Sequence, residues 1–372
     1  MGFLWSCCHA GCFWGSLGAE SEVAQEPGHP GVTGEWHPFL PCARALGTAR
    51  VLTSDGGRGQ KGDYLVLAVM VSIVCGAGLN FGLPIGILCG LLGGSIAVQF
   101  NWSGLAGFWG ACIVSVPFAL VAGYFYAVLL NNVKGSEMTV GNYMAFSIVS
   151  LMSIAWLVLP YNNPKIVWPI TGVGLRTTMT LEDNYDKVLD NFLRIDFKQM
   201  GVLQNNPYWK DFSVSTGLLL VFAVGCLLMW LFMKTKAGII MRCSGVNPGF
   251  SRTLGVNNNR VRTIGIVAST VIAAIGINIY SQSYGFYQFY SAPLMMAFPA
   301  MAAILIGGAT PKKASVFNVV LGVILFQCLL TLATPVANAV INAGSISEVV
   351  RIIVQNGIIL YALTKIRANG GK

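Results

Sequence analysis

Long apolar segments follow one another along this chain from residue 64 to residue 363, and they constrain its fold more than any other feature. Most approach the length of about 20 residues that a helix needs to cross a bilayer. Backbone polar groups inside lipid must be satisfied internally, which favours helices. The sequence therefore predicts an all-α fold, a polytopic transmembrane helical bundle of about nine to ten spans. The predicted spans are 64–80, 81–100, 105–131, 139–161, 213–233, 263–281, 293–309, 315–334 and 347–363.

The charge balance supports a membrane protein. Only 10% of the residues are charged, whereas a soluble domain carries about 25%. The net charge of +9 does not indicate a nucleic-acid partner, because the basic residues lie in short connectors between apolar segments. We expect the lipid bilayer to be the surrounding partner.

The distribution of Lys and Arg predicts the topology. Four connectors together hold twelve Lys and Arg and a single acid, Glu137. Such an excess marks cytoplasmic loops, so we place these connectors and the tail 368–372 in the cytoplasm and the loop 162–212 outside. The basic connectors are 132–138, 234–262, 312–313 and 365–372.

Residues 1–62 differ from the transmembrane domain, which we assign to 63–367. They hold all three histidines and four of the ten cysteines. One interpretation is a metal site formed by Cys7, Cys8, His9 and Cys12, but this spacing matches no standard zinc pattern. We expect instead a disordered segment or a gene-model artefact, because the topology places residue 63 outside and a further span upstream would fit better. No metal and no other cofactor is expected.

A break near residues 78–86 interrupts the first apolar stretch. Pro84 removes a backbone donor, and Gly82 loosens a helix. A broken helix in lipid survives where it is buried or lines a cavity, so Asn80, Gly82 and Pro84 are candidates for a translocation pathway. The alternative is a plain loop between two short helices, in which Asn80 is a helix cap.

The connector 241–262 is polar and basic, and its glycine and asparagine punctuation predicts a short helix bracketed by turns. The chain has no Walker A loop. All its histidines lie in the first 62 residues, so no catalytic triad is available and no catalytic residue is expected. The predicted spans carry no central acid or lysine, which argues against an ion-coupled carrier. We therefore expect the energy to come from a separate subunit.

The connector resembles the cytoplasmic coupling loop of permease subunits of binding-protein-dependent ABC importers, in the branch for simple sugars, nucleosides and branched-chain amino acids. Those permeases show a Gly-x-Asn-x-x-Ala-Ala-x-x-x-Gly-Ile-Asn pattern, which Gly245, Asn247, Gly255, Val256 and Asn257 match. The Ala-Ala pair is replaced by residues 250–251. The resemblance covers about 63–367 and includes weaker matches at 79–82 and at the Gly-Gly turn 306–310.

The resemblance implies that the loop 235–262 couples the permease to an ABC ATPase, with Gly245, Asn247, Gly255, Val256, Asn257 and Arg260 in contact. It also implies an extracytoplasmic solute-binding protein, a second permease copy or paralogue, and a multi-pass location in the bacterial cytoplasmic (inner) membrane. Three tyrosines have two possible roles. They either stack on the binding protein or form an ordinary aromatic belt at the membrane interface. They are Tyr284, Tyr287 and Tyr290.

The sequence thus favours a permease subunit, not itself an enzyme, for a small polar solute such as a sugar or a nucleoside. A branched-chain amino acid permease is the alternative. The rival classes are an ion-coupled secondary transporter or channel and a membrane scaffold.

Overall fold

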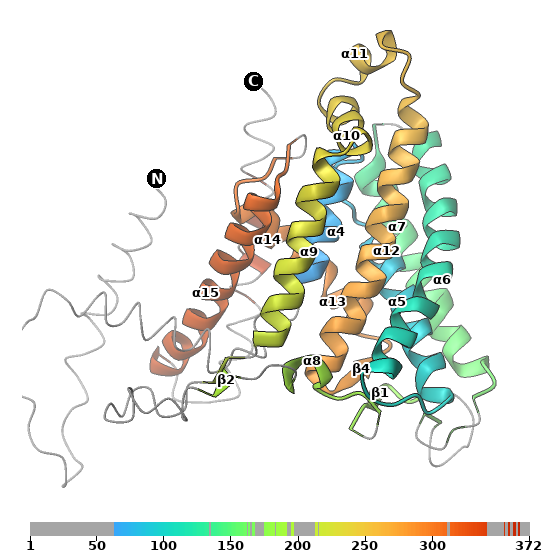
Figure 1. Ribbon diagram of the computed structural model, residues 1–372, viewed down its shortest axis with the longest axis vertical. Helices are drawn as coiled ribbons and strands as arrows, with labels where there is room; N and C mark the ends of the chain where they lie inside the picture. Colours follow the sequence, from blue (N-terminus) through green and yellow to red (C-terminus); the bar gives the residue numbers. More distant parts are fainter. Residues whose placement is uncertain are drawn as a thin grey trace, which may run out of the picture.

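The computed structural model describes residues 63–133, 135–161, 163, 166–167, 175–182, 184–191, 195–196, 213–214, 216–310 and 313–340, and single positions between 353 and 364 (Figure 1). Several predictions lie outside the described residues. They concern the segment 1–62, most of the loop 162–212, nearly all of the last span 347–363 and the tail 368–372.

Helices dominate the described part, as predicted. Four of them are long and apolar enough to cross a membrane, and shorter apolar helices accompany them, so the helical membrane bundle is confirmed and the number of spans stays a prediction. The helices are α4 (Asp63–Val74), α5 (Leu83–Gln99), α6 (Gly104–Asn132), α7 (Glu137–Val158), α8 (Val188–Asn191), α9 (Thr216–Lys234), α10 (Lys236–Val246), α11 (Pro248–Thr253), α12 (Asn258–Tyr284), α13 (Ala292–Met295), α14 (Ala297–Ile306) and α15 (Val316–Val340).

Two short sheets modify the all-α prediction. Strand β1 (Thr178–Thr180) pairs antiparallel with β4 (Phe286–Gln288), with Met179 opposite Tyr287. Strand β2 (Ile195–Asp196) pairs antiparallel with β3 (Ser213–Val214). These pairs lie in connectors beyond the bundle, where backbone groups no longer have to be satisfied within one helix.

The centre of the bundle is formed by α4, α5 and α12. Residues 64–74 of α4 are all buried, and α12 buries residues along most of its length. Contacts along α12 show that α4 runs opposite to it and that α5 runs in the same direction. The successive contacts are Cys75–Gly265, Ala68–Ser269 and Tyr64–Gly276 for α4, and Gly86–Thr270 and Gly90–Ala274 for α5.

The interruption in the first apolar stretch is therefore a reversal of the chain, which corrects the prediction of one broken helix near 78–86. Helix α4 ends at Val74 and α5 begins at Leu83, so the reversal covers residues 75–82. Pro84 lies in the first turn of α5, where the missing N–H breaks no helical hydrogen bond. The alternative of a loop between two helices describes this segment better.

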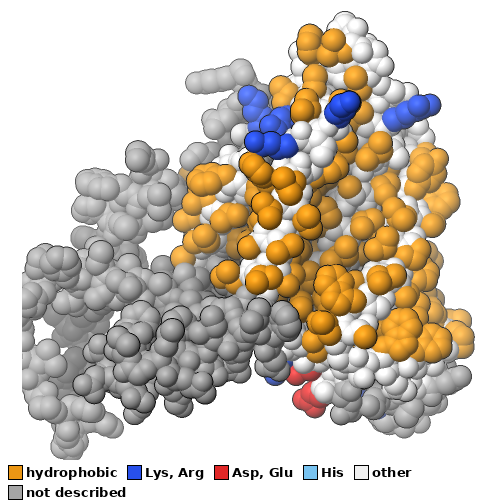
Figure 2. Space-filling view, in the orientation of Figure 1, with side chains coloured by type: hydrophobic (Ala, Val, Ile, Leu, Met, Phe, Trp, Pro, Cys, Tyr) orange, Lys and Arg blue, Asp and Glu red, His pale blue; other side chains and the backbone are white. Residues whose placement is uncertain are grey.

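The two ends of the bundle differ in charge. Lys and Arg side chains gather at the end that carries α10 and α11, acidic side chains appear at the opposite end, and an apolar band lies between them (Figures 1 and 2). Large apolar side chains on the outer helices are exposed, including Trp109, Phe125 and Leu151. A wide exposed apolar band is the surface that lipid requires. The described parts of the loop 162–212 lie at the end opposite to α10 and α11 (Figure 1).

Candidate functional site

The predicted short helix bracketed by turns is confirmed as α11, and the coupling segment, residues 235–262, also contains α10 and the start of α12. Helix α10 precedes the turn at Asn247, α11 follows it, and α12 already begins at Asn258, before the predicted start at 263. The side chain of Asn247 caps α11 by accepting a hydrogen bond from Phe250 N at 3.1 Å. Asn257 caps α12 by accepting from the backbone N–H of Asn259 at 3.2 Å and of Arg260 at 3.3 Å. The asparagines thus set the helix boundaries, because their short side chains satisfy the free N–H groups of a first turn.

Gly255 makes the turn between α11 and α12. Its φ is +77°, and a β-carbon added to it would meet no atom within 4 Å. Its N–H donates to Arg252 O at 3.0 Å, and Val256 N–H donates to Ser251 O at 3.1 Å, which closes the carboxyl end of α11. The left-handed backbone conformation therefore favours glycine at this position, whereas the surrounding atoms would leave room for a side chain.

Gly245 brings α10 into direct contact with the reversal that follows α4. A β-carbon at Gly245 would lie 2.2 Å from Val74 O. On the other side of the contact, a β-carbon at Gly76 would lie 2.9 Å from the α-carbon of Gly245. Any side chain at Gly245 would separate α10 from the end of α4.

Asn258 joins the helices of the coupling segment and was not identified from the sequence. It is 7% exposed. Its Nδ2 donates to Pro248 O at 2.7 Å, and its Oδ1 accepts from Ser244 Oγ at 3.2 Å. One amide thus ties the start of α12 to α10 and α11. Nothing in the sequence distinguishes it from its neighbours Asn257 and Asn259.

The outer surface of the coupling segment is apolar and basic. Val246 is 44% exposed, Phe250 54% and Leu254 61%, and the side chains of Arg252 and Arg260 are exposed beside them. Ser251 is fully buried, so in the pair that replaces Ala-Ala only Phe250 faces outward. Phenylalanine and arginine are both enriched in protein–protein interfaces.

Asn80 and Gly82, two of the predicted pathway residues, are packed inside the bundle. Asn80 is 3% exposed, and its Oδ1 accepts from Gly82 N and from Tyr126 OH, both at 3.0 Å. Its Nδ2 donates to Ser269 Oγ at 3.2 Å. A β-carbon at Gly82 would lie 2.2 Å from the Tyr126 ring. Asn80 therefore holds the reversal to α6 and α12.

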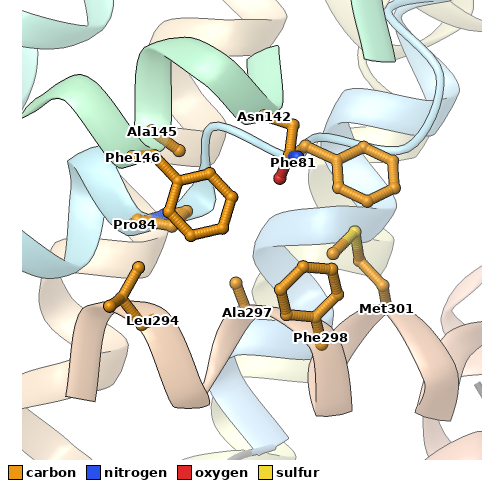
Figure 3. Close-up of a pocket in the computed structure, with 9 residues that line it drawn as sticks. All are labelled: Phe81, Pro84, Asn142, Ala145, Phe146, Leu294, Ala297, Phe298 and Met301. Carbon is orange, nitrogen blue, oxygen red and sulfur yellow. The ribbon is translucent and has the colours of Figure 1, made fainter. Parts of the chain in front are cut away.

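Pro84 lines a small pocket beside the reversal. Its volume of ≈ 10 Å³ leaves room for about one water molecule. Eight of the nine lining residues are apolar and the ninth is Asn142 (Figure 3). The rings of Phe81 and Phe298 meet edge-on across it, with centroids 6.1 Å apart. The other lining residues are Ala145, Phe146, Leu294, Ala297 and Met301.

Asn142 is the polar group of this pocket and was not identified from the sequence. In Figure 3 its amide points into the space between Phe81 and Phe146. The amide makes no hydrogen bond with any residue of the described part of the chain. It is therefore free to bind a polar group that enters from outside the protein.

Tyr287 cannot stack on a binding protein, which corrects the stacking interpretation for this one of the three tyrosines. It is fully buried, and its hydroxyl donates to Asn278 Oδ1 at 2.6 Å and lies 3.1 Å from Tyr185 OH. Burial raises the pKa of Tyr185 and of Tyr287, so both hydroxyls stay protonated at neutral pH. Tyr284 is 38% exposed and stacks on Tyr280.

Three relatives share part of the chain. The nucleoside ABC transporter permease protein NupC of Lactococcus lactis is 29% identical over 132 residues, which cover 35% of this chain and 42% of that protein. The nucleoside ABC transporter permease protein NupB, also of Lactococcus lactis, is 24% identical over 144 residues, which cover 38% of this chain and 36% of that protein. The probable branched-chain amino acid transport permease protein LivH of Methanocaldococcus jannaschii is 27% identical over 191 residues, with 44% and 60% covered.

The matched region thus spans less than two thirds of each of these relatives. No solved structure matches the chain significantly. Residues 60–363 match the family described as "Branched-chain amino acid transport system / permease component", which includes the coupling segment, the reversal and the pocket. This chain, a multi-pass membrane protein, belongs to that family of transport permeases.

Proposed function

We propose that the chain is the membrane-spanning permease subunit of an ABC importer and that the coupling segment docks it on a separate ATPase. The observation that carries this proposal is the exposed surface of α10 and α11. Phe250, Leu254 and Arg252 form an apolar and basic tip, and Asn258 holds that tip rigidly on α12. A rigid tip moves as one body when its partner closes, and such a movement shifts the permease between inward-open and outward-open states.

The proposal includes the other partners and the location. An extracytoplasmic solute-binding protein delivers the solute to the end opposite to the coupling segment, and a second copy or a paralogue completes the permease. The complex lies in a bacterial cytoplasmic membrane, with the basic end in the cytoplasm. In this arrangement Gly245, Asn247, Gly255, Val256, Asn257 and Arg260 shape or contact the ATPase-binding surface. The loop 162–212 faces the binding protein.

The pocket beside Pro84 lies on the translocation pathway in this proposal. It is closed in this state, because it holds about one water molecule. A solute passes only after α5, α7 and α14 separate. Asn80 and Gly82 act indirectly, by holding the reversal that carries Phe81.

Pocket chemistry supports a nucleoside as the solute. Phe81, Phe146 and Phe298 offer rings for stacking, and Asn142 offers one amide for a base edge (Figure 3). Asparagine amides and aromatic rings are the groups that recognise bases in other proteins. Two of the three relatives above are named as nucleoside permeases.

A branched-chain amino acid is the second candidate, supported by the name of the third relative and by the family description. Its carboxylate needs a cation or free backbone donors. The pocket is lined by no charged residue, and the first N–H groups of α5 are occupied. Gly82 N donates to Asn80 Oδ1, Leu83 N to Asn80 O and Ile85 N to Gly82 O.

Uptake assays with two labelled solutes distinguish the two candidates. The importer, purified with the partners that accompany it and reconstituted into liposomes, is given tritiated adenosine or tritiated leucine with internal or external ATP. We expect ATP-dependent adenosine uptake, and a loss of about tenfold in Asn142→Ala, the size of one missing amide contact. Asn132→Ala, an exposed asparagine of α6 that does not line the pocket, is the matched control. ATP-dependent uptake of leucine alone would replace the nucleoside by the second candidate.

A further inference from the structure

Arg262 and Glu137 form a partly buried ion pair at the end of the bundle that carries α10 and α11. Arg262 Nη2 lies 3.2 Å from Glu137 Oε1, and the two side chains are 10% and 22% exposed. Glu137 is the first residue of α7 and Arg262 lies in the second turn of α12. The pair thus joins two helices that begin at the same end of the molecule.

The Arg262–Glu137 pair makes a single contact and adds little to the stability of the fold. Arg262 uses one nitrogen toward Glu137, and its buried Nε has no partner among the described residues. The second carboxylate oxygen of Glu137 accepts from Gly135 N at 2.9 Å. A partly buried pair with a single contact adds little to stability, since the desolvation of the two charges offsets much of their attraction. Its spare donors allow the contact to persist while the two helices shift.

Within the coupling segment, Asn258 connects Arg262 to α10 and α11. The two residues are one turn apart on α12 and both are buried, so their side chains lie on the same face of the helix. Asn258 is bonded to Pro248 O and to Ser244 Oγ. Any displacement of α10 and α11 is therefore carried directly to the Arg262 guanidinium.

Glu137 connects that guanidinium to the pocket, because it is the first residue of α7. Helix α7 buries only a narrow stripe, with Gly141, Ala145, Val149 and Trp156 as its buried residues. A helix held on so narrow a stripe can shift as a rigid body. Asn142, Ala145 and Phe146 of this same helix line the pocket.

We propose that the Arg262–Glu137 pair transmits the movement of the coupling segment to α7 and thereby opens and closes the pocket. Both residues are positioning residues in this proposal. The inference rests on the proposed function, because a coupling segment that docks on no ATPase has no movement to transmit. It adds a defined connection between the ATPase-binding tip and the solute pathway.

The test measures solute uptake per ATP hydrolysed in the reconstituted importer. The variants are Arg262→Glu, Glu137→Arg and the exchanged double variant, with Lys313→Glu as a matched control. Lys313 has an exposed side chain in the described connector between α14 and α15 and forms no ion pair with a described residue. Recovery of the ATPase with the unaltered chain is checked first, since its absence would refute the proposed function and not the pair alone.

Each single variant is expected to retain the ATPase and its hydrolysis, while uptake per ATP falls by about 5- to 150-fold, the usual range of coupling between sites. The exchanged double variant is expected to recover most of this loss, and Lys313→Glu is expected to behave like the unaltered protein. A merely structural pair would lower assembly, hydrolysis and uptake together and would leave uptake per ATP unchanged. That result would overturn the inference.

Glu137→Gln is a second test of the inference, for use if the charge-reversal variants do not fold. It keeps the size of the side chain and an acceptor for Arg262 but removes the charge. We expect normal assembly and hydrolysis with reduced uptake per ATP. Unchanged uptake per ATP in Glu137→Gln would also overturn the inference.

Discussion

Gly245 and Gly76 touch backbone to backbone, since a β-carbon on Gly76 would lie 2.9 Å from the α-carbon of Gly245. The contact seats α10 on the reversal between α4 and α5, which carries Phe81 into the pocket. The coupling segment therefore reaches the pocket along two routes. One runs through this glycine contact, and the other runs through Arg262 and Glu137.

Gly245→Ala is expected to push α10 away from α4. The added carbon would lie 2.2 Å from Val74 O, and overpacking of this kind costs about 1–3 kcal/mol. We expect a lower thermal unfolding temperature in detergent and reduced uptake per ATP. Gly357→Ala is the matched control, because it lies outside the coupling segment and its β-carbon would meet no atom within 4 Å. Equal behaviour of the two variants would show that the glycine contact is dispensable.

Substitutions at Gly255 are expected to follow conformational preference and not size. The φ of +77° lies in the left-handed region and the space around the residue is open. A left-handed conformation costs about 1–2 kcal/mol for most residues, and asparagine tolerates it better. We therefore expect coupled uptake to decrease in the order Gly255→Asn, Gly255→Ala, Gly255→Val. An order that followed side-chain volume, with asparagine worse than alanine, would contradict this account.

Asn80→Ala separates a structural role from a direct pathway role. The substitution leaves Gly82 N and Tyr126 OH without their acceptor, at about 1–3 kcal/mol for each buried group. We expect a clear loss of thermal stability, and a smaller loss of about 1 kcal/mol in Tyr126→Phe, which removes one of these hydrogen bonds. Tryptophan fluorescence during heating in detergent measures both. Normal stability of Asn80→Ala with altered uptake would show that Asn80 contacts the solute instead.

Local sequence signals predicted the features that depend on neighbouring residues. Asn247, Gly255 and Asn257 mark helix ends through hydrogen bonds to residues two or three positions away, and such rules hold without tertiary structure. Gly308, with a φ of +85°, likewise forms the predicted turn after α14. Hydropathy identified the apolar segments because lipid imposes the same requirement on each of them.

Long-range packing could not be predicted in the same way. The partners of Asn80 are 46 and 189 residues away, and Arg262 finds Glu137 at a separation of 125 residues. Nothing in the run of three asparagines at 257–259 distinguished the buried Asn258 from its neighbours. Hydropathy also does not indicate the direction in which a helix runs. The apolar stretch of α4 and α5 is therefore consistent both with one broken helix and with two helices joined by a reversal.

Co-purification from native membranes tests the central claim most directly. The unaltered chain and Phe250→Asp are extracted in mild detergent, and the accompanying proteins are identified by mass spectrometry. We predict that an ATPase with a Walker A loop accompanies the unaltered chain and is lost from Phe250→Asp, whose exposed ring is replaced by a charge while the fold is retained. Recovery of the chain alone, with solute uptake driven by an ion gradient, would contradict the account and favour a secondary transporter.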